Sequence, residues 1–82
     1  MNFMLTEHAR KRCMQRRIPE AWIAQALNNP LRIEDDPDDY RLVQVVWPVP
    51  ERGFRLLRVI YNDTRDPVAV VTAYFDNEAC PP

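Results

Sequence analysis

The chain has 82 residues, of which 46% are hydrophobic and 28% are charged, and its formal net charge is -1. This length allows one small domain, and the apolar and aromatic content excludes a disordered chain. No apolar run approaches the roughly 20 residues that span a bilayer, and the N-terminus lacks the apolar region of a signal peptide. The sequence therefore predicts a cytoplasmic protein and no membrane partner.

The charges are unevenly distributed. Residues 1–17 carry five Arg or Lys against one Glu, whereas residues 34–39, EDDPDD, carry five acids. The basic stretch coincides with the first of two expected helices.

Thr6 is a favourable N-cap for a helix over about residues 6–17, and Pro19 suits the first turn of a second helix over about 19–28.

The residues after Pro30 are rich in β-branched and aromatic side chains. They predict four strands, at about residues 31–35, 40–47, 54–62 and 68–75, followed by a tail over 76–82. We therefore expect a single α+β domain over residues 1–82, with two N-terminal helices packed on a four-stranded, mainly antiparallel sheet. The sequence does not determine the oligomeric state.

The first helix carries two overlapping stripes on a helical wheel. The polar stripe consists of His8, Arg12 and Arg16, and the apolar stripe consists of Leu5, Ala9 and Cys13. The polar stripe is thus predicted at the boundary between core and water, where a purely solubilising charge has no reason to lie. Two ordinary readings remain open: an arginine there can pair with a carboxylate, and a lone histidine often only packs and hydrogen-bonds.

The last two strands contain three polar exceptions. Arg58 is expected on one face with Phe54, Leu56 and Ile60, so it needs a buried partner or an anion. Thr72 and Tyr74 are expected on one face with Val68 and Val70. Both residues also have explanations that involve no function. Thr72 favours β-strands, and Tyr74 suits the amphipathic edge of the core.

The pattern T-x-H-A-x-x-R-x-x-x-R-x-I over Thr6 to Ile18, with LLRVIY and VVTAYF near the C-terminus, resembles a small bacterial domain family of unknown function. That family has been grouped with RelE-like ribonuclease toxins in the barnase, EndoU, colicin and RelE superfamily. The resemblance implies two helices followed by a four-stranded sheet. Two positions depart from it: Arg17 stands where relatives usually have Gly, and Cys13 where Met is usual.

The resemblance also implies a site that matches the residues singled out above: His8, Arg12, Arg16, Arg58, Thr72 and Tyr74. Metal-independent RNA cleavage by a 2′-hydroxyl needs a base, an acid and cations that stabilise the phosphorane. His8 could act as base or acid, and Arg12 and Arg58 could clamp phosphate oxygens. Tyr74 could stack on a nucleobase or donate a proton, while Arg16 and Thr72 could bind substrate.

The predicted function is thus an RNA-cleaving toxin of a toxin–antitoxin or related system, with RNA and a possible protein antitoxin as partners and no cofactor. No metal site is expected, since DDPDD lacks a calcium-loop pattern and one histidine with the distant Cys13 and Cys80 makes no zinc site. A non-catalytic RNA- or protein-binding module with the same fold remains an alternative. A helix-turn-helix is disfavoured because the second helix carries a single charge, Glu20.

Overall fold

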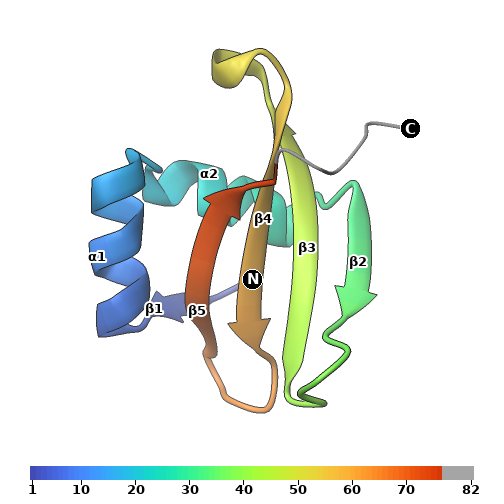
Figure 1. Ribbon diagram of the computed structural model, residues 1–82. Coiled ribbons are helices and arrows are strands. Elements are labelled where there is room, and N and C mark those ends of the chain that lie inside the picture. The colour runs from blue at the N-terminus through green and yellow to red at the C-terminus, as the bar shows by residue number, and fades with distance from the viewer. Residues whose placement is uncertain (77–82) are drawn as a thin grey trace.

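A computed structural model describes residues 1–76, which adopt the expected α+β class (Figure 1). The helices are α1 (Glu7–Arg16) and α2 (Glu20–Asn28). The strands are β1 (Phe3–Leu5), β2 (Arg32–Asp35), β3 (Leu42–Val49), β4 (Arg55–Asn62) and β5 (Val68–Phe75), with a 3-10 turn, η1 (Pro50–Arg52), between β3 and β4. Neither helix of this described part is long and apolar enough to cross a membrane.

The sheet has five strands, so the expectation of four was wrong. Its order is β1-β5-β4-β3-β2, with β1 parallel to β5 and every other neighbouring pair antiparallel. The additional strand is three residues long, too short for a period to be recognised in the sequence. Leu5 therefore belongs to β1 and not to the helix, because Thr6 ends the strand and caps α1 by accepting a hydrogen bond from the Ala9 N–H.

Most element bounds agree with the sequence to within one residue, but β3 is shifted from 40–47 to Leu42–Val49. At its start, Asp36 and Asp39 accept hydrogen bonds from backbone N–H groups of the loop and hold it as a turn. At its end, Pro48 remains in the strand opposite Leu56. Of the expected tail, Asp76 is described, and residues 77–82, including Cys80, lie outside the described residues.

The hydrophobic core lies between the two helices and one face of the sheet. Its buried helical residues are Ala9, Cys13, Ile23, Ala26 and Leu27, and they pack against Val45, Leu57, Val59 and Val70 of the strands. α1 lies along the β5 side of the sheet, and α2 crosses behind β3 and β4 (Figure 1). The opposite face of the sheet is not covered by either helix.

A β-bulge in β5 decides which residues reach that uncovered face. Ile60 pairs with Thr72, but Tyr61 pairs with Val70, so Val71 is the extra residue. The bulge reverses the alternation, so Thr72 and Tyr74 point away from the face that Val68 and Val70 share. The expectation that all four residues share one face was therefore wrong.

Helix α1 ends at Arg17, which has a left-handed backbone (φ 56°, ψ 49°) and donates its N–H to the carbonyls of Cys13 and Met14. Glycine adopts this conformation without steric cost, whereas a residue with a Cβ is strained there.

We expect Arg17→Gly to raise the free energy of unfolding by about 1 kcal/mol, because it removes this strain. Urea unfolding followed by circular dichroism measures the change. Arg17→Ala is the matched control, since it removes the charge but keeps the Cβ and should bring no such gain. Equal stability of the two variants would contradict the explanation.

Candidate functional site

The predicted polar stripe of α1 runs alongside β5. The Arg16 guanidinium reaches the sheet and donates a 2.7 Å hydrogen bond to the Ala73 carbonyl. His8 and Arg12 precede Arg16 by two helical turns and one, so they continue the stripe toward the start of α1. All three residues are exposed, and the hydrogen bond to Ala73 places the Arg16 guanidinium at the boundary with the sheet.

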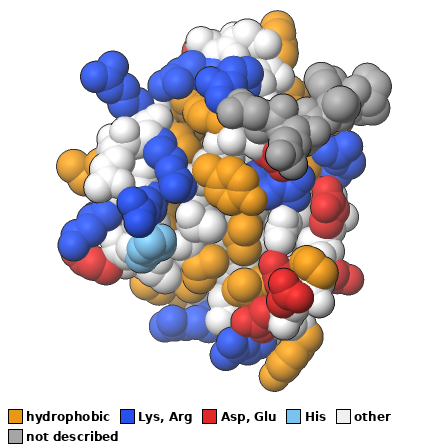
Figure 2. Space-filling model, in the orientation of Figure 1, with side chains coloured by type: hydrophobic (Ala, Val, Ile, Leu, Met, Phe, Trp, Pro, Cys, Tyr) orange, Lys and Arg blue, Asp and Glu red, His pale blue; other side chains and the backbone are white. Residues whose placement is uncertain are grey.

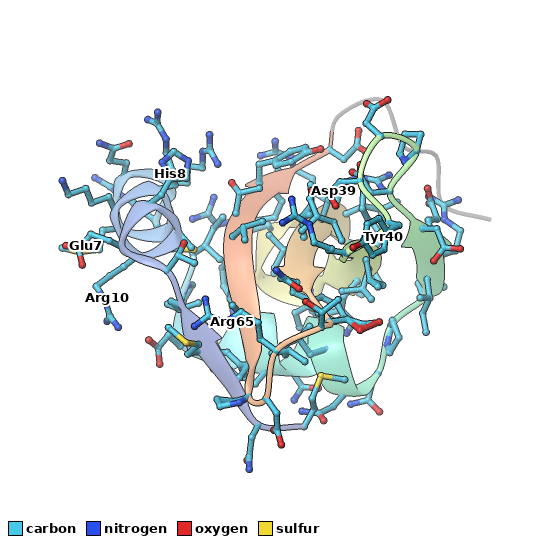
Figure 3. All side chains as sticks on the ribbon, turned by 90° about the horizontal axis from the view of Figure 1, so that it is seen from below. Glu7, His8, Arg10, Asp39, Tyr40 and Arg65 are labelled. Carbon is cyan, nitrogen blue, oxygen red and sulfur yellow. The ribbon has the colours of Figure 1, made fainter. Side chains whose placement is uncertain are left out.

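The stripe borders the uncovered face of the sheet. Figure 3 shows His8 on the same side of the sheet as Asp39 and Tyr40 of the β2–β3 loop, with Arg10 pointing away from that side. Within residues 1–76, no hydrogen bond or ion pair engages the His8 imidazole. Arg12 donates a 3.1 Å hydrogen bond to Gln15 on the exposed surface of α1. Both side chains are therefore available to a ligand.

Arg58 lies on the uncovered face but is itself buried, with 9% of its surface exposed. Its Nε donates to Asp76 Oδ2 at 2.8 Å, and its Nη1 donates to Gln44 Oε1 at 2.9 Å and lies 3.5 Å from Glu34 Oε2. Gln44 in turn donates to Asp36 at 2.7 Å. The buried guanidinium is thus held by carboxylates and an amide of the chain itself.

This network also sets the electrostatics of Arg58. Burial by itself lowers the pKa of the guanidinium, but the hydrogen bond to Asp76 and the charge of Glu34 outweigh that effect and raise the pKa. The expected need for a buried partner or an anion is met within the protein. Arg58 therefore holds the sheet surface together, and its charge is already balanced before any phosphate approaches.

The structure brings three of the predicted residues together on neighbouring strands. Tyr74 lies directly opposite Arg58, and Thr72 lies opposite Ile60, so both border the network on its β5 side. Both are half-buried. Arg16 adjoins them through the carbonyl of Ala73, which lies between them in the chain. His8 and Arg12 lie on the edge of this surface and not within it.

The charges on this face of the molecule are unevenly distributed. Figure 2 shows Lys and Arg side chains with the histidine around α1, and Asp and Glu side chains on the side of the β2–β3 loop. In that loop, hydrogen bonds from Arg41 lower the pKa of Asp39 to about 2, so Asp39 stays ionised at any physiological pH. The α1 side of this face is thus more basic than the loop side.

A second basic group was not predicted from the sequence. Arg52 of the β3–β4 hairpin lies over the rings of Trp22 and Phe75, 5.4 Å from each centroid, and Arg55 lies 4.8 Å from the Phe75 centroid. Arg52 also donates to the Arg17 carbonyl at 3.2 Å. The sequence ERGFR shows that these two arginines lie close together in the chain. It could not show that their aromatic partners are Trp22 of α2 and Phe75 of β5.

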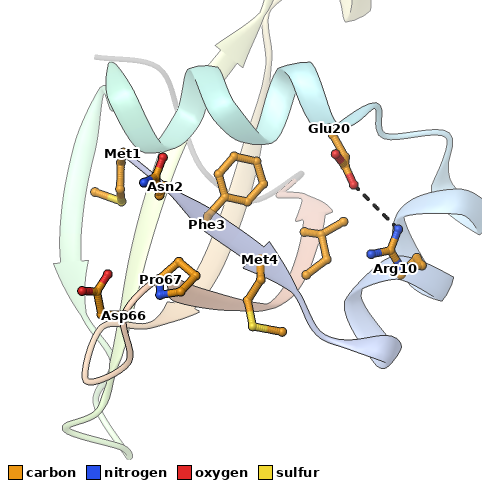
Figure 4. A pocket seen from close by; sticks show the side chains of 9 residues that line it. Met1, Asn2, Phe3, Met4, Arg10, Glu20, Asp66 and Pro67 are labelled. Atoms are coloured by element: carbon orange, nitrogen blue, oxygen red, sulfur yellow. Dashed lines mark ion pairs between the residues drawn. The ribbon is translucent and has the colours of Figure 1, made fainter.

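The described surface also has grooves, but they lie elsewhere. One of about 750 Å³ runs along β1 and is crossed by the Arg10–Glu20 ion pair at 3.8 Å (Figure 4). Another of about 440 Å³ lies between α1 and the start of α2. None of the six predicted site residues lines either groove. In residues 1–76, no three His, Cys, Asp or Glu side chains gather as a metal site.

The six predicted residues thus lie outside both of these grooves. The chain belongs to the family described as Domain of unknown function (DUF4258). The family model matches residues 5–75, which include both helices and all strands except most of β1. No curated protein and no solved structure matches this DUF4258 chain.

The Arg58 network makes a prediction about stability. Arg58→Ala should lower the free energy of unfolding by about 2 to 3 kcal/mol, because it removes the buried guanidinium to which Asp76, Gln44 and Glu34 are joined. The loss stays below the full cost of a buried ion pair since Glu34 is partly exposed. Urea unfolding measures it.

Arg65→Ala, which removes one exposed charge from the β4–β5 loop, is the control and should stay within about 0.5 kcal/mol of the wild type. If Arg58→Ala unfolds at the same urea concentration as Arg65→Ala, the network does not stabilise the sheet. A destabilised Arg58 variant would also be a poor probe of function, because lost activity could reflect lost folding.

Proposed function

We propose that this DUF4258 domain binds RNA along the surface formed by the α1 stripe and the uncovered faces of β4 and β5. One observation carries the proposal: the exposed stripe of His8, Arg12 and Arg16 borders the uncovered face of the sheet. It lies on the β5 side of that face, away from the acidic β2–β3 loop. Phosphates would lie along α1, where the cations are available. The bases would then point over β5.

Each side of the surface has a distinct part in this proposal. Arg12 and Arg16 contribute charge and planar donors that suit phosphate oxygens. Tyr74 offers an aromatic ring and a hydroxyl on the sheet, and Arg58 positions it from the opposite strand. Arg58 is therefore assigned a positioning role, because Asp76 and Glu34 already occupy its guanidinium.

Salt dependence tests the proposed phosphate contact. Arg12→Gln should weaken RNA binding and reduce the slope of log K against log salt concentration by about 0.7, the value for one lost phosphate contact to a single strand. Fluorescence anisotropy with a labelled single-stranded RNA measures both quantities over a series of salt concentrations.

Arg10→Gln is the matched control. It removes the same charge from the same helix, but Arg10 faces Glu20 on the other side of α1. Its slope should remain close to that of the wild type. If Arg10→Gln and Arg12→Gln change the slope equally, binding is diffuse and the proposed surface is wrong.

RNA cleavage is a second candidate function, favoured by the imidazole of His8, which is exposed and has no partner within residues 1–76. In this reaction the 2′-oxygen would bond to phosphorus while its proton passes to a base. The bond from phosphorus to the 5′-oxygen would break as that oxygen gains a proton. His8 could serve as base or acid, with Arg12 stabilising the charge on the phosphorane.

His8→Ala should reduce cleavage at least about 100-fold, the usual lower contribution of a general acid or base. Gel analysis of labelled RNA in the presence of a chelator measures cleavage, and Arg10→Gln again serves as the control. Equal cleavage by His8→Ala and wild type would remove His8 from the mechanism. If the wild type binds RNA but does not cleave it, the domain is a non-catalytic RNA-binding module.

A toxin role, as in RelE-like ribonucleases, extends the cleavage proposal. Induction of the wild-type chain in bacteria should then slow growth and deplete total RNA, and His8→Ala should reverse both effects. A protein antitoxin would be expected to cover the same α1 surface. Wild-type expression without an effect on growth would oppose the toxin role but leave RNA binding in place.

A further inference from the structure

Phe54 is unfavourable at its position for two reasons, its exposure to solvent and its backbone conformation. It lies between η1 and β4 at the hairpin tip, where 61% of its surface is exposed. Its backbone is left-handed, with φ 63°, and it follows Gly53, which has the same φ. A bulky aromatic residue is a rare occupant of this conformation, and exposure of its ring brings no compensating burial.

The hairpin does not need an aromatic side chain for its own geometry. Its turn is closed by backbone hydrogen bonds, from the Gly53 N–H to the Pro50 carbonyl at 3.2 Å and from the Phe54 N–H to the Val49 carbonyl at 2.8 Å. Glycine at position 54 could form the same bonds without strain. A residue that a fold disfavours and does not require indicates a role outside the fold.

The surroundings of Phe54 are basic. Arg52 and Arg55 flank it, and the nearby acid Glu51 is engaged by the Trp22 indole N–H at 3.2 Å. The hydrogen bond from Arg52 to the Arg17 carbonyl ties this hairpin to the C-terminal end of α1. Phe54 therefore lies on a hairpin that is joined to the C-terminal end of α1, the end that carries Arg16.

We propose that Phe54 stacks on an unpaired nucleobase of the RNA that the α1 stripe holds by its phosphates. An exposed aromatic ring next to cations is the usual means of binding single-stranded RNA, since each base offers a π-face and the phosphates need positive charge. Bases in a duplex are already stacked on their neighbours. The inference rests on the proposed function and specifies its substrate as single-stranded RNA.

Two variants separate this role from a role in folding. Phe54→Gly removes the ring and relieves the backbone, so the variant should resist urea at least as well as the wild type. Phe54→Tyr keeps an aromatic ring. Anisotropy measurements use two labelled probes, a short oligouridine and an RNA duplex of mixed sequence, at low salt.

We expect Phe54→Gly to bind oligouridine about 5- to 100-fold more weakly than the wild type, the range for loss of one stacked base. Its affinity for the duplex should be unchanged, and Phe54→Tyr should bind oligouridine as the wild type does. Retained stability with lost single-strand binding is a combination that a merely structural Phe54 would not produce.

The outcomes also separate this inference from the proposed function. If Arg12→Gln weakens oligouridine binding and Phe54→Gly does not, the α1 surface stands and the stacking role is wrong. If the wild type binds neither probe, both are wrong. If light scattering shows a wild-type dimer that Phe54→Gly abolishes while RNA affinity is unchanged, Phe54 is a protein contact and the inference is overturned.

Discussion

Burial of one face of the sheet by both helices is the constraint on which the rest of the structure depends. Ile23 of α2 and Ala9 of α1 are fully buried against the same layer of strand residues, including Leu57 and Val59. The other face is covered by neither helix, although Val46 and Leu56 are buried there beside Arg58. The other face must therefore be stabilised by other means, and it is there that the polar side chains of the strands gather.

The network around Arg58 provides that stabilisation. A guanidinium buried on an otherwise apolar strand is tolerable only when carboxylates and an amide saturate it, and Glu34, Gln44 and Asp76 do so from three different segments. The network thus joins β2, β3, β4 and the end of β5 across the uncovered face. Tyr74 lies opposite Arg58 at the border of this network.

Much of the fold could be predicted from the sequence because its elements are bounded by strong local signals. The N-cap at Thr6, the prolines and the aspartates of the turns set the ends of both helices and of most strands, and the wheel identified the stripe on α1. β1 was not predicted, because a strand of three residues is too short to show a period of alternating side chains. The end of β3 was misplaced because Pro48, which reads as a turn residue, lies inside the strand.

The candidate site was likewise predicted only in part from the sequence. The sequence by itself determined that His8, Arg12 and Arg16 lie on one side of a helix, since a period of 3.6 residues fixes which side chains share a face. Only the tertiary structure decided that Thr72 and Tyr74 meet Arg58, because one extra residue at Val71 reverses the alternation of β5. It also decided that the partners of Arg58 are carboxylates of the chain, since pairing across the sheet joins segments whose separation in the sequence leaves no local trace.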